Sequence, residues 1–243
     1  MAANPLSLRI GVFGPEEAPG EEPRGCSLWQ VGYAASLTAA GATPVLLGQR
    51  AAGRSWSELL HDVLGLVWAG RPSESTVPTG EEERLCNWCR KNSFPLLAVD
   101  GALQVLNSVF GGTLHLDLAA ERPEALQHRH PPEKGLRHAI EVVPGTRLSE
   151  IYGDGEIVVN SEHRRGVARV ARGFRVGASA LDGVVEAIEA ENDKWFAVGV
   201  QWRPASASAS GLDIQLFRGL IDAAGQRLET LQPRQRIACT AAA

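Results

Sequence analysis

The sequence predicts an α/β domain with a mostly parallel central sheet, helices on both faces and additional antiparallel strands in the C-terminal half. Apolar segments typical of strands alternate with helical segments through residue 110, as in right-handed βαβ units. Residues 95–99 are apolar without alternation, which is typical of a strand buried on both faces of a parallel sheet. From residue 157, short strand-like segments follow one another, with a turn signal at 182–183.

The first half of the chain is predicted to alternate strands with helices. Gly41 is a typical residue beyond a helix C-terminus and ends the first predicted helix. Thr79 and Glu82 have the spacing of a capping box and begin a later helix. The predicted strands cover residues 8–13, 44–47, 63–68 and 95–99, and the predicted helices cover residues 27–40 and 80–91.

The second half is predicted to contain short strands and one final helix. Ser210 and Asp213 are expected to cap this helix, which covers residues 212–224. We expect residues 1–230 to form a single domain and residues 231–243 to form a flexible tail. The predicted strands cover residues 157–160, 174–178, 184–188 and 195–202.

The composition is that of an ordinary globular protein. The chain has 243 residues, 44% of them hydrophobic and 21% charged, with a net charge of −4. Acidic and basic residues are interspersed, so we expect neither a nucleic-acid partner nor a membrane partner. The N-terminal residues lack the pattern of a signal peptide, and four cysteines do not make a disulfide framework. These features predict a cytoplasmic location.

A sharp turn between a buried strand and a helix is predicted at Asp100. The apolar segment 95–99 leads into Asp100-Gly101, and a helical pattern follows. This is the layout of a nucleophile elbow, in which the residue at the turn presents its side chain at the carboxyl edge of the sheet. Asp100 is therefore the first candidate for a functional residue.

Eight short motifs, in this order along the chain, resemble the class I glutamine amidotransferase-like superfamily, specifically its gamma-glutamyl-gamma-aminobutyrate hydrolase branch. Each motif alone is weak evidence, whereas the ordered set is fairly specific. The resemblance implies a flavodoxin-like three-layer sandwich and a class I glutamine amidotransferase-like domain over residues 1–230. The motifs cover residues 33–41, 44–47, 63–71, 104–107, 111–114, 159–163, 182–187 and 199–204.

The resemblance also implies a catalytic triad whose three members are substituted in this chain. The family has a cysteine at the elbow, and a histidine and a glutamate in the Gln-Trp-x-Pro segment. The corresponding residues here are Asp100, Arg203 and Ala205. The positions that the resemblance implies for ligand binding and for the oxyanion donors are Gly70, Arg71, Gly101, Gln104, Asn160, Ser161 and His163. A structural role is an equally good interpretation of Asn160, Ser161 and His163.

The substituted residues are poor replacements for a triad. A cysteine is nucleophilic because its thiolate is accessible near neutral pH, whereas a carboxylate is a poor nucleophile toward an amide. Arginine stays protonated and cannot act as a general base. Asp100 and Arg203 are instead expected to face each other as an ion pair, because buried charges are tolerated as pairs.

We therefore expect a catalytically degenerate homologue that binds a ligand or a partner protein. The ligand would be small and polar, either glutamine-like or gamma-glutamyl, and the partner could be a second copy of the chain. One alternative is an active hydrolase of gamma-glutamyl amide C–N bonds that uses Asp100 and His163. A second alternative is a regulatory or scaffold subunit of an amidotransferase or synthetase complex. Whether the chain is an enzyme stays open at this stage.

Two further groups of residues have alternative interpretations. Cys86 and Cys89 have redox spacing, but they lie in the middle of a predicted helix, which favours structural cysteines. The segment His128-Arg129-His130 could bind a transition metal, but the prolines that follow favour a solvated loop. We expect neither a metal nor a cofactor.

Overall fold

The computed structural model describes residues 7–14, 26–47, 55–70, 77–129, 136–231 and 240–241. Its strands are β1 (Ser7–Phe13), β2 (Thr43–Leu47), β3 (Gly65–Ala69), β4 (Leu96–Val99), β5 (Thr113–His115), β6 (Arg137–Val142), β7 (Gly155–Asn160), β8 (Gly166–Arg169), β9 (Phe174–Ala180), β10 (Val185–Ala190), β11 (Ala197–Val200) and β12 (Thr240–Ala241). Its α-helices are α1 (Cys26–Ala39), α2 (Trp56–Leu59), α3 (Gly80–Lys91), α4 (Gly101–Val109), α5 (Leu118–Glu121), α6 (Arg147–Tyr152) and α7 (Ile214–Thr230).

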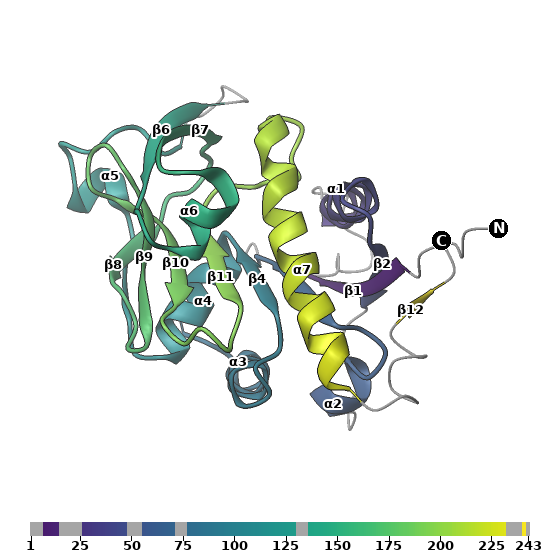
Figure 1. The fold of residues 1–243 in the computed structure, drawn as a ribbon. Helices are drawn as coiled ribbons and strands as arrows, with labels where there is room; N and C mark the ends of the chain where they lie inside the picture. The colour runs from purple at the N-terminus through teal and green to yellow at the C-terminus, as the bar shows by residue number, and fades with distance from the viewer. Residues whose placement is uncertain are drawn as a thin grey trace.

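One mixed sheet runs through the described part of the molecule (Figure 1). Its parallel part has the order β2-β1-β3-β4-β11, and its antiparallel part continues as β10-β9-β6-β7. β5 pairs with β8, which joins β10, and β12 pairs with β1. The predicted α/β class is therefore confirmed, with parallel strands mainly from the first half and antiparallel strands from the second.

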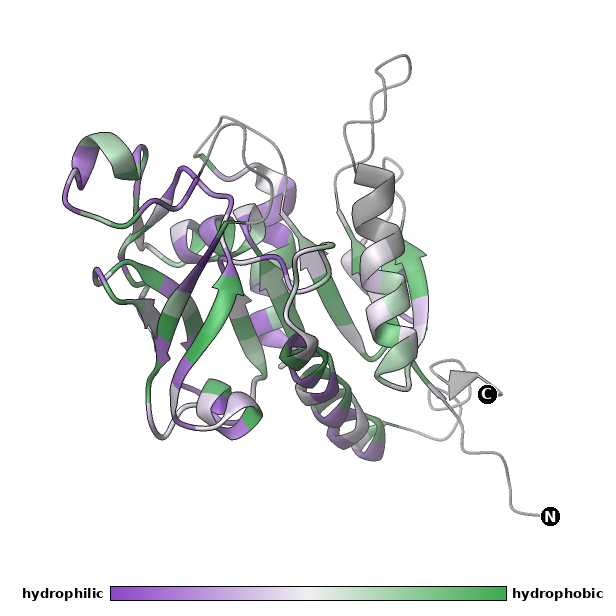
Figure 2. Ribbon diagram, turned by 90° about the horizontal axis from the view of Figure 1, so that it is seen from above, coloured by the Kyte–Doolittle hydropathy of each residue, from purple (hydrophilic) through white to green (hydrophobic). Residues whose placement is uncertain are grey.

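Helices cover both faces of the sheet. On one face, α1, α6 and α7 pack onto the strands through residues such as Tyr33, Leu148 and Phe217. On the other face, α2, α3 and α4 pack through residues such as Trp56 and Leu103. Figure 2 shows the strands coloured mainly as hydrophobic, whereas α7 carries both hydrophobic and hydrophilic residues. In the described ranges, no helix is long and apolar enough to cross a membrane.

Local signals in the sequence locate several element ends correctly. Gly41 has a φ of 99° just beyond α1, as expected of a glycine in the left-handed region. Thr79 and Glu82 form the predicted capping box at the start of α3. Ser210 and Asp213 form another, which begins a short 3-10 helix (Gly211–Asp213) that leads into α7. The predicted end of the final helix at residue 224 was wrong, because α7 continues to Thr230.

The described residues of the predicted C-terminal tail include a short strand. Thr240 and Ala241 pair antiparallel with Leu8 and Ser7 of β1. Residues 232–239 lie outside the described residues, and the flexibility predicted for them stays a prediction. Arg71 and His130 also lie outside the described residues.

Candidate functional site at the turn of Asp100

Asp100 occupies the predicted sharp turn between β4 and α4. Its backbone has φ 54° and ψ −117°, a conformation that residues with a side chain rarely adopt. Such a conformation costs on the order of 1–3 kcal/mol and persists only where the surrounding structure holds it. The Asp100 amide donates to the Val200 carbonyl of β11 at 2.8 Å, so the neighbouring strand anchors the turn. The sheet thus fixes the place from which the carboxylate projects.

Both oxygens of the Asp100 carboxylate have partners from the segment that follows β11. The Arg203 guanidinium donates to Oδ2 through Nε at 3.1 Å and through Nη2 at 2.9 Å. The Gln201 side-chain amide donates to Oδ1 at 2.8 Å. The Asp100 and Arg203 side chains expose 14% and 22% of their surface. The ion pair expected from the sequence is therefore present, and it lies partly open to solvent.

Arg203 is held from a second side by the end of β7. Asn160 brackets the Arg203 backbone, because its Nδ2 donates to the Arg203 carbonyl at 2.9 Å and its Oδ1 accepts from the Arg203 amide at 3.0 Å. Glu162 accepts from Arg203 Nη1 at 2.6 Å. The guanidinium thus lies between two carboxylates, Asp100 and Glu162.

The backbone around the turn is tightly packed. A Cβ on Gly70, at the end of β3, would collide with the Gly101 backbone and lie 2.8 Å from the Val99 carbonyl oxygen. A Cβ on Gly32 of α1 would lie 2.6 Å from the Ala205 carbonyl oxygen. These contacts place Gly70 against Gly101 at the turn and Ala205 against α1. They also leave no space for a side chain at position 70.

Polar groups behind the turn form a connected network. Gln104 of α4 donates from Nε2 to Gln201 Oε1 at 3.1 Å and to the Arg165 carbonyl at 3.4 Å. Tyr33 of α1 is buried, and burial together with the negative charge of Asp100 raises the pKa of its hydroxyl. Gln104 therefore supports Gln201, which in turn orients Asp100.

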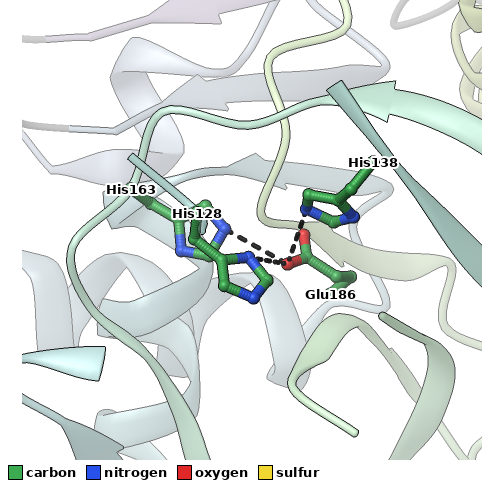
Figure 3. A group of neighbouring side chains, drawn as sticks. All are labelled: His128, His138, His163 and Glu186. Carbon is green, nitrogen blue, oxygen red and sulfur yellow. Dashed lines mark hydrogen bonds and ion pairs between the residues drawn. The ribbon is translucent and has the colours of Figure 1, made fainter. Parts of the chain in front are cut away.

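His163 and Ser161 point away from Asp100. His163 Nδ1 lies 2.8 Å from the Arg165 carbonyl, and its Nε2 lies 3.1 Å from Glu186 Oε1 (Figure 3). The Ser161 hydroxyl donates to the His128 carbonyl at 2.9 Å. Side chains of this segment alternate in direction, so that Asn160 and Glu162 face Arg203 while Ser161 and His163 face the opposite way. The structure therefore brings Asn160 to the turn and separates Ser161 and His163 from it.

Sequence reasoning missed several residues of the network around Asp100 and of the polar group around His163. Gln201 lies within the Gln-Trp-x-Pro segment but was not assigned a contact with Asp100, and Glu162 lies within the motif at 159–163. The prediction that His128 belongs to a solvated loop was wrong, because its side chain is only 2% exposed and packs against His163 and Glu186. Glu186, at 0% exposed, lies within a predicted strand and within the motif at 182–187, but neither marked it as a functional residue.

Cys86 and Cys89 have the burial expected of structural cysteines, as the sequence indicated. Cys86 and Cys89 lie on the buried face of α3, and both are 0% exposed. Burial raises the pKa of each thiol, and the proximity of Cys89 adds to the effect at Cys86. Neither thiol lies in the network around Asp100.

Comparisons with known proteins show which family the chain is similar to. Residues 10–205 match the Peptidase C26 family. The chain is 33% identical over 215 residues to a gamma-glutamyl-gamma-aminobutyrate hydrolase of Escherichia coli O157:H7, covering 79% of this chain and 84% of that protein. It is 32% identical over 215 residues to the gamma-glutamyl-gamma-aminobutyrate hydrolase PuuD of Escherichia coli strain K12, with the same coverage.

A solved structure, that of a protein from Thermoplasma acidophilum named as a GMP synthase component, shares the fold at low sequence identity. The superposition has a TM-score of 0.64 at 17% identity and covers 92% of this chain and 97% of that one. This likeness confirms the flavodoxin-like glutamine amidotransferase fold. Together with the match over residues 10–205 and the relatives at about one-third identity, it leads to one conclusion: the chain belongs to the Peptidase C26 family of glutamine amidotransferase-like proteins.

Proposed function

We propose that this protein is a catalytically degenerate member of its family and acts by binding a ligand or a partner protein. The observation that carries the proposal is the ion pair at the elbow, where Arg203 donates twice to Asp100 Oδ2. An arginine and an aspartate that neutralise each other at the nucleophile position form a stable polar contact. They provide no group that attacks a carbonyl carbon.

The chemistry of the three substituted positions supports the proposal. Asp100 has one oxygen bound to Arg203 and the other to Gln201, and both contacts lower the nucleophilicity of its carboxylate. Arg203 keeps its proton at any working pH and cannot activate a nucleophile. Ala205 has no polar group that could orient a base. Triad members act as a unit, so the loss of all three is expected to remove most of the catalytic rate.

An active hydrolase that uses Asp100 and His163 is the alternative, and the contacts of His163 disfavour it. A general base must lie within hydrogen-bonding reach of the proton that it removes. The two ring nitrogens of His163 face the Arg165 carbonyl and Glu186. Asp100 would also need to break its ion pair before it could react.

The proposed ligand is small and polar, because the relatives are named for gamma-glutamyl substrates. The proposed binding positions are those that the family resemblance implies: Gly70, Arg71, Gly101, Gln104, Asn160, Ser161 and His163. The side chains of Gln104, Asn160, Ser161 and His163 already bind protein groups. Gln104 and Asn160 would shape the wall of the site at the turn, whereas Ser161 and His163 face away from Asp100. A regulatory or scaffold role in an amidotransferase or synthetase complex would use the same fold without any ligand chemistry.

The test is a hydrolysis assay on the full-length chain. Gamma-glutamyl-gamma-aminobutyrate and glutamine are offered separately, and released glutamate and ammonia are measured, with PuuD from Escherichia coli as the positive control. We expect no release above a buffer blank. Turnover that disappears in an Asp100→Asn variant would refute the proposal, since Asp100 would then be shown to take part in catalysis.

A further inference from the structure

Four side chains from separate parts of the chain converge behind the elbow. His128 precedes β6, His138 lies in β6, His163 follows β7, and Glu186 lies in β10 (Figure 3). One potential ligand atom from each residue lies within 4.8 Å of all the others. The side chains expose 2%, 7%, 1% and 0% of their surface, in the same order. We call these four residues the histidine cluster.

The three imidazole rings all direct a nitrogen at the same carboxylate oxygen. Glu186 Oε1 lies 3.2 Å from His128 Nδ1, 3.5 Å from His138 Nε2 and 3.1 Å from His163 Nε2. Ligand atoms placed tetrahedrally around Zn²⁺ at its usual bond lengths lie about 3.3 Å from one another. The three separations between a ring nitrogen and Glu186 Oε1 are thus close to that value.

The other ring nitrogens show which atoms carry protons. His163 Nδ1 lies 2.8 Å from the Arg165 carbonyl, and His138 Nδ1 lies 3.1 Å from the Ala139 carbonyl. A carbonyl oxygen only accepts, so each Nδ1 is the protonated nitrogen of its ring. His128 Nε2 likewise faces an acceptor, the Asp182 carboxylate, at 2.9 Å. In the neutral rings, the three nitrogens that face Glu186 therefore carry lone pairs.

Lone pairs aimed at a carboxylate repel it, and a cation bound between them would remove that repulsion. Within the described part of the chain, His128 Nδ1, His138 Nε2 and Glu186 Oε2 make no hydrogen bond although all three atoms are buried. Three imidazolium rings would satisfy Glu186 but would crowd three like charges into a buried space. A single divalent cation satisfies all three nitrogens at once, and the charges of Glu186 and Asp182 balance it.

We propose that the histidine cluster is a structural zinc site. Imidazole nitrogen and carboxylate oxygen are common zinc donors, and four protein ligands are typical of closed, structural sites. The second ring nitrogen of each histidine contacts a carboxylate or a backbone carbonyl, as histidine ligands of metals usually do. A hollow of 690 Å³ lined by His128 and His163 provides the access route for the ion.

The ion would hold in place the segment of residues 160–163, which contacts Arg203 at the elbow. His163 and Ser161 are on one side of the segment whose other side, Asn160 and Glu162, binds Arg203. The Gln201 backbone amide also donates to the Glu186 carbonyl at 2.8 Å, so a ligand of the ion is paired with the strand end that orients Asp100. The proposal concerns metal binding alone and does not depend on whether the elbow is catalytic.

The experiment measures zinc binding to the full-length chain without a histidine tag. After exposure to Zn²⁺ and dialysis against metal-free buffer, elemental analysis gives the zinc content, and competition with a chelating dye gives the Kd. We expect about one zinc ion per chain. Replacement of zinc by Co²⁺ should give the intense visible absorption of a four-coordinate ion.

Two variants and a matched control make the test specific. Asp182→Asn removes the charge of the partner of His128, whose carboxylate also accepts from the Leu126 and Val184 amides, and should raise the zinc Kd roughly 10–100-fold. Glu186→Gln removes a ligand charge and should raise it further. His115→Gln changes a histidine of β5 outside the histidine cluster and should leave the Kd unchanged. Circular dichroism of each variant verifies that it is folded. Substoichiometric zinc in the wild-type protein, or equal Kd values for folded Asp182→Asn and the wild type, would overturn the proposal.

Discussion

The ion pair at the elbow can be measured by a double-mutant cycle on Asp100 and Arg203. Asp100→Asn removes the negative charge and keeps an amide that can still contact Gln201. Arg203→Met removes the guanidinium and keeps most of the aliphatic length. Each single variant and the double variant are unfolded in urea at pH 7, and the coupling energy is the departure from additivity.

The expected coupling lies between the values for exposed and for buried pairs. Exposed pairs contribute about 0.2–1 kcal/mol, whereas removal of one partner from a buried pair costs about 3–5 kcal/mol. At 14% and 22% side-chain exposure, the pair lies nearer the buried limit. Glu162 still binds Arg203 when Asp100 is neutral, and Gln201 still binds Asp100 when Arg203 is absent. Each single variant therefore loses less folding stability than it would without these partners. We expect a coupling energy of about 1–2 kcal/mol.

The two single variants should also differ from each other. Arg203→Met leaves the Asp100 carboxylate, whose side chain is 14% exposed, with the Gln201 amide as its side-chain partner among the described residues. Asp100→Asn leaves Arg203 bound to Glu162. Arg203→Met should therefore cost more stability. The exposed pair of Asp117 and Arg164, with 30% and 63% exposure, provides the control cycle. A coupling at Asp100 no larger than in the control would refute this reasoning.

Two further predictions concern the backbone of the turn and the buried thiols. Asp100→Gly should cost less stability than Asp100→Ala by on the order of 1 kcal/mol, because both variants lose the ion pair but only glycine tolerates a φ of 54°. Equal urea midpoints for the two variants would show that the turn carries no backbone strain. Cys86 and Cys89 should react with iodoacetamide at pH 7 only after unfolding, because burial raises the pKa of both thiols. Mass spectrometry of the native protein would contradict this if either residue were modified rapidly.

Much of the fold could be predicted because its signals are local. Residues 96–99 form a strand that is buried throughout, as the uninterrupted apolar run indicated. Helix α6, by contrast, was not predicted, and its N-terminus shows the reason. Glu189 of β10 accepts from the amides of Arg147 and Leu148 at 2.9 and 3.1 Å. Thr146 also caps the helix locally, because its hydroxyl accepts from the Ser149 amide at 3.1 Å. This Thr-Ser pair lacks the Glu or Gln that marks a capping box in a sequence, and the contacts from Glu189, some forty positions away, leave no pattern near the helix.

The contrast between local signals and contacts from distant parts of the chain also applies to the two polar networks, one around Asp100 and one around Glu186. The Asp100–Arg203 pair could be predicted because Asp100 lies at a turn that the sequence marks and Arg203 lies in the Gln-Trp-x-Pro motif at the end of a predicted strand. The histidine cluster could not, since His128, His138, His163 and Glu186 come from four parts of the chain and have no short spacing in common. Strand β6 was also missed. Its charged and polar residues Arg137, His138 and Glu141 conceal the buried Ile140 and Val142.

The alternation of side chains along residues 160–163 has a consequence for how this protein can evolve. Asn160 and Glu162 serve Arg203, whereas Ser161 and His163 serve the histidine cluster, so a single stretch of backbone supplies both networks. Exchanging a residue on one side disturbs one network only. Inserting or deleting a single residue would turn every later side chain to the opposite side and disrupt both. The length of this segment is therefore under a stricter constraint than the identity of any residue in it.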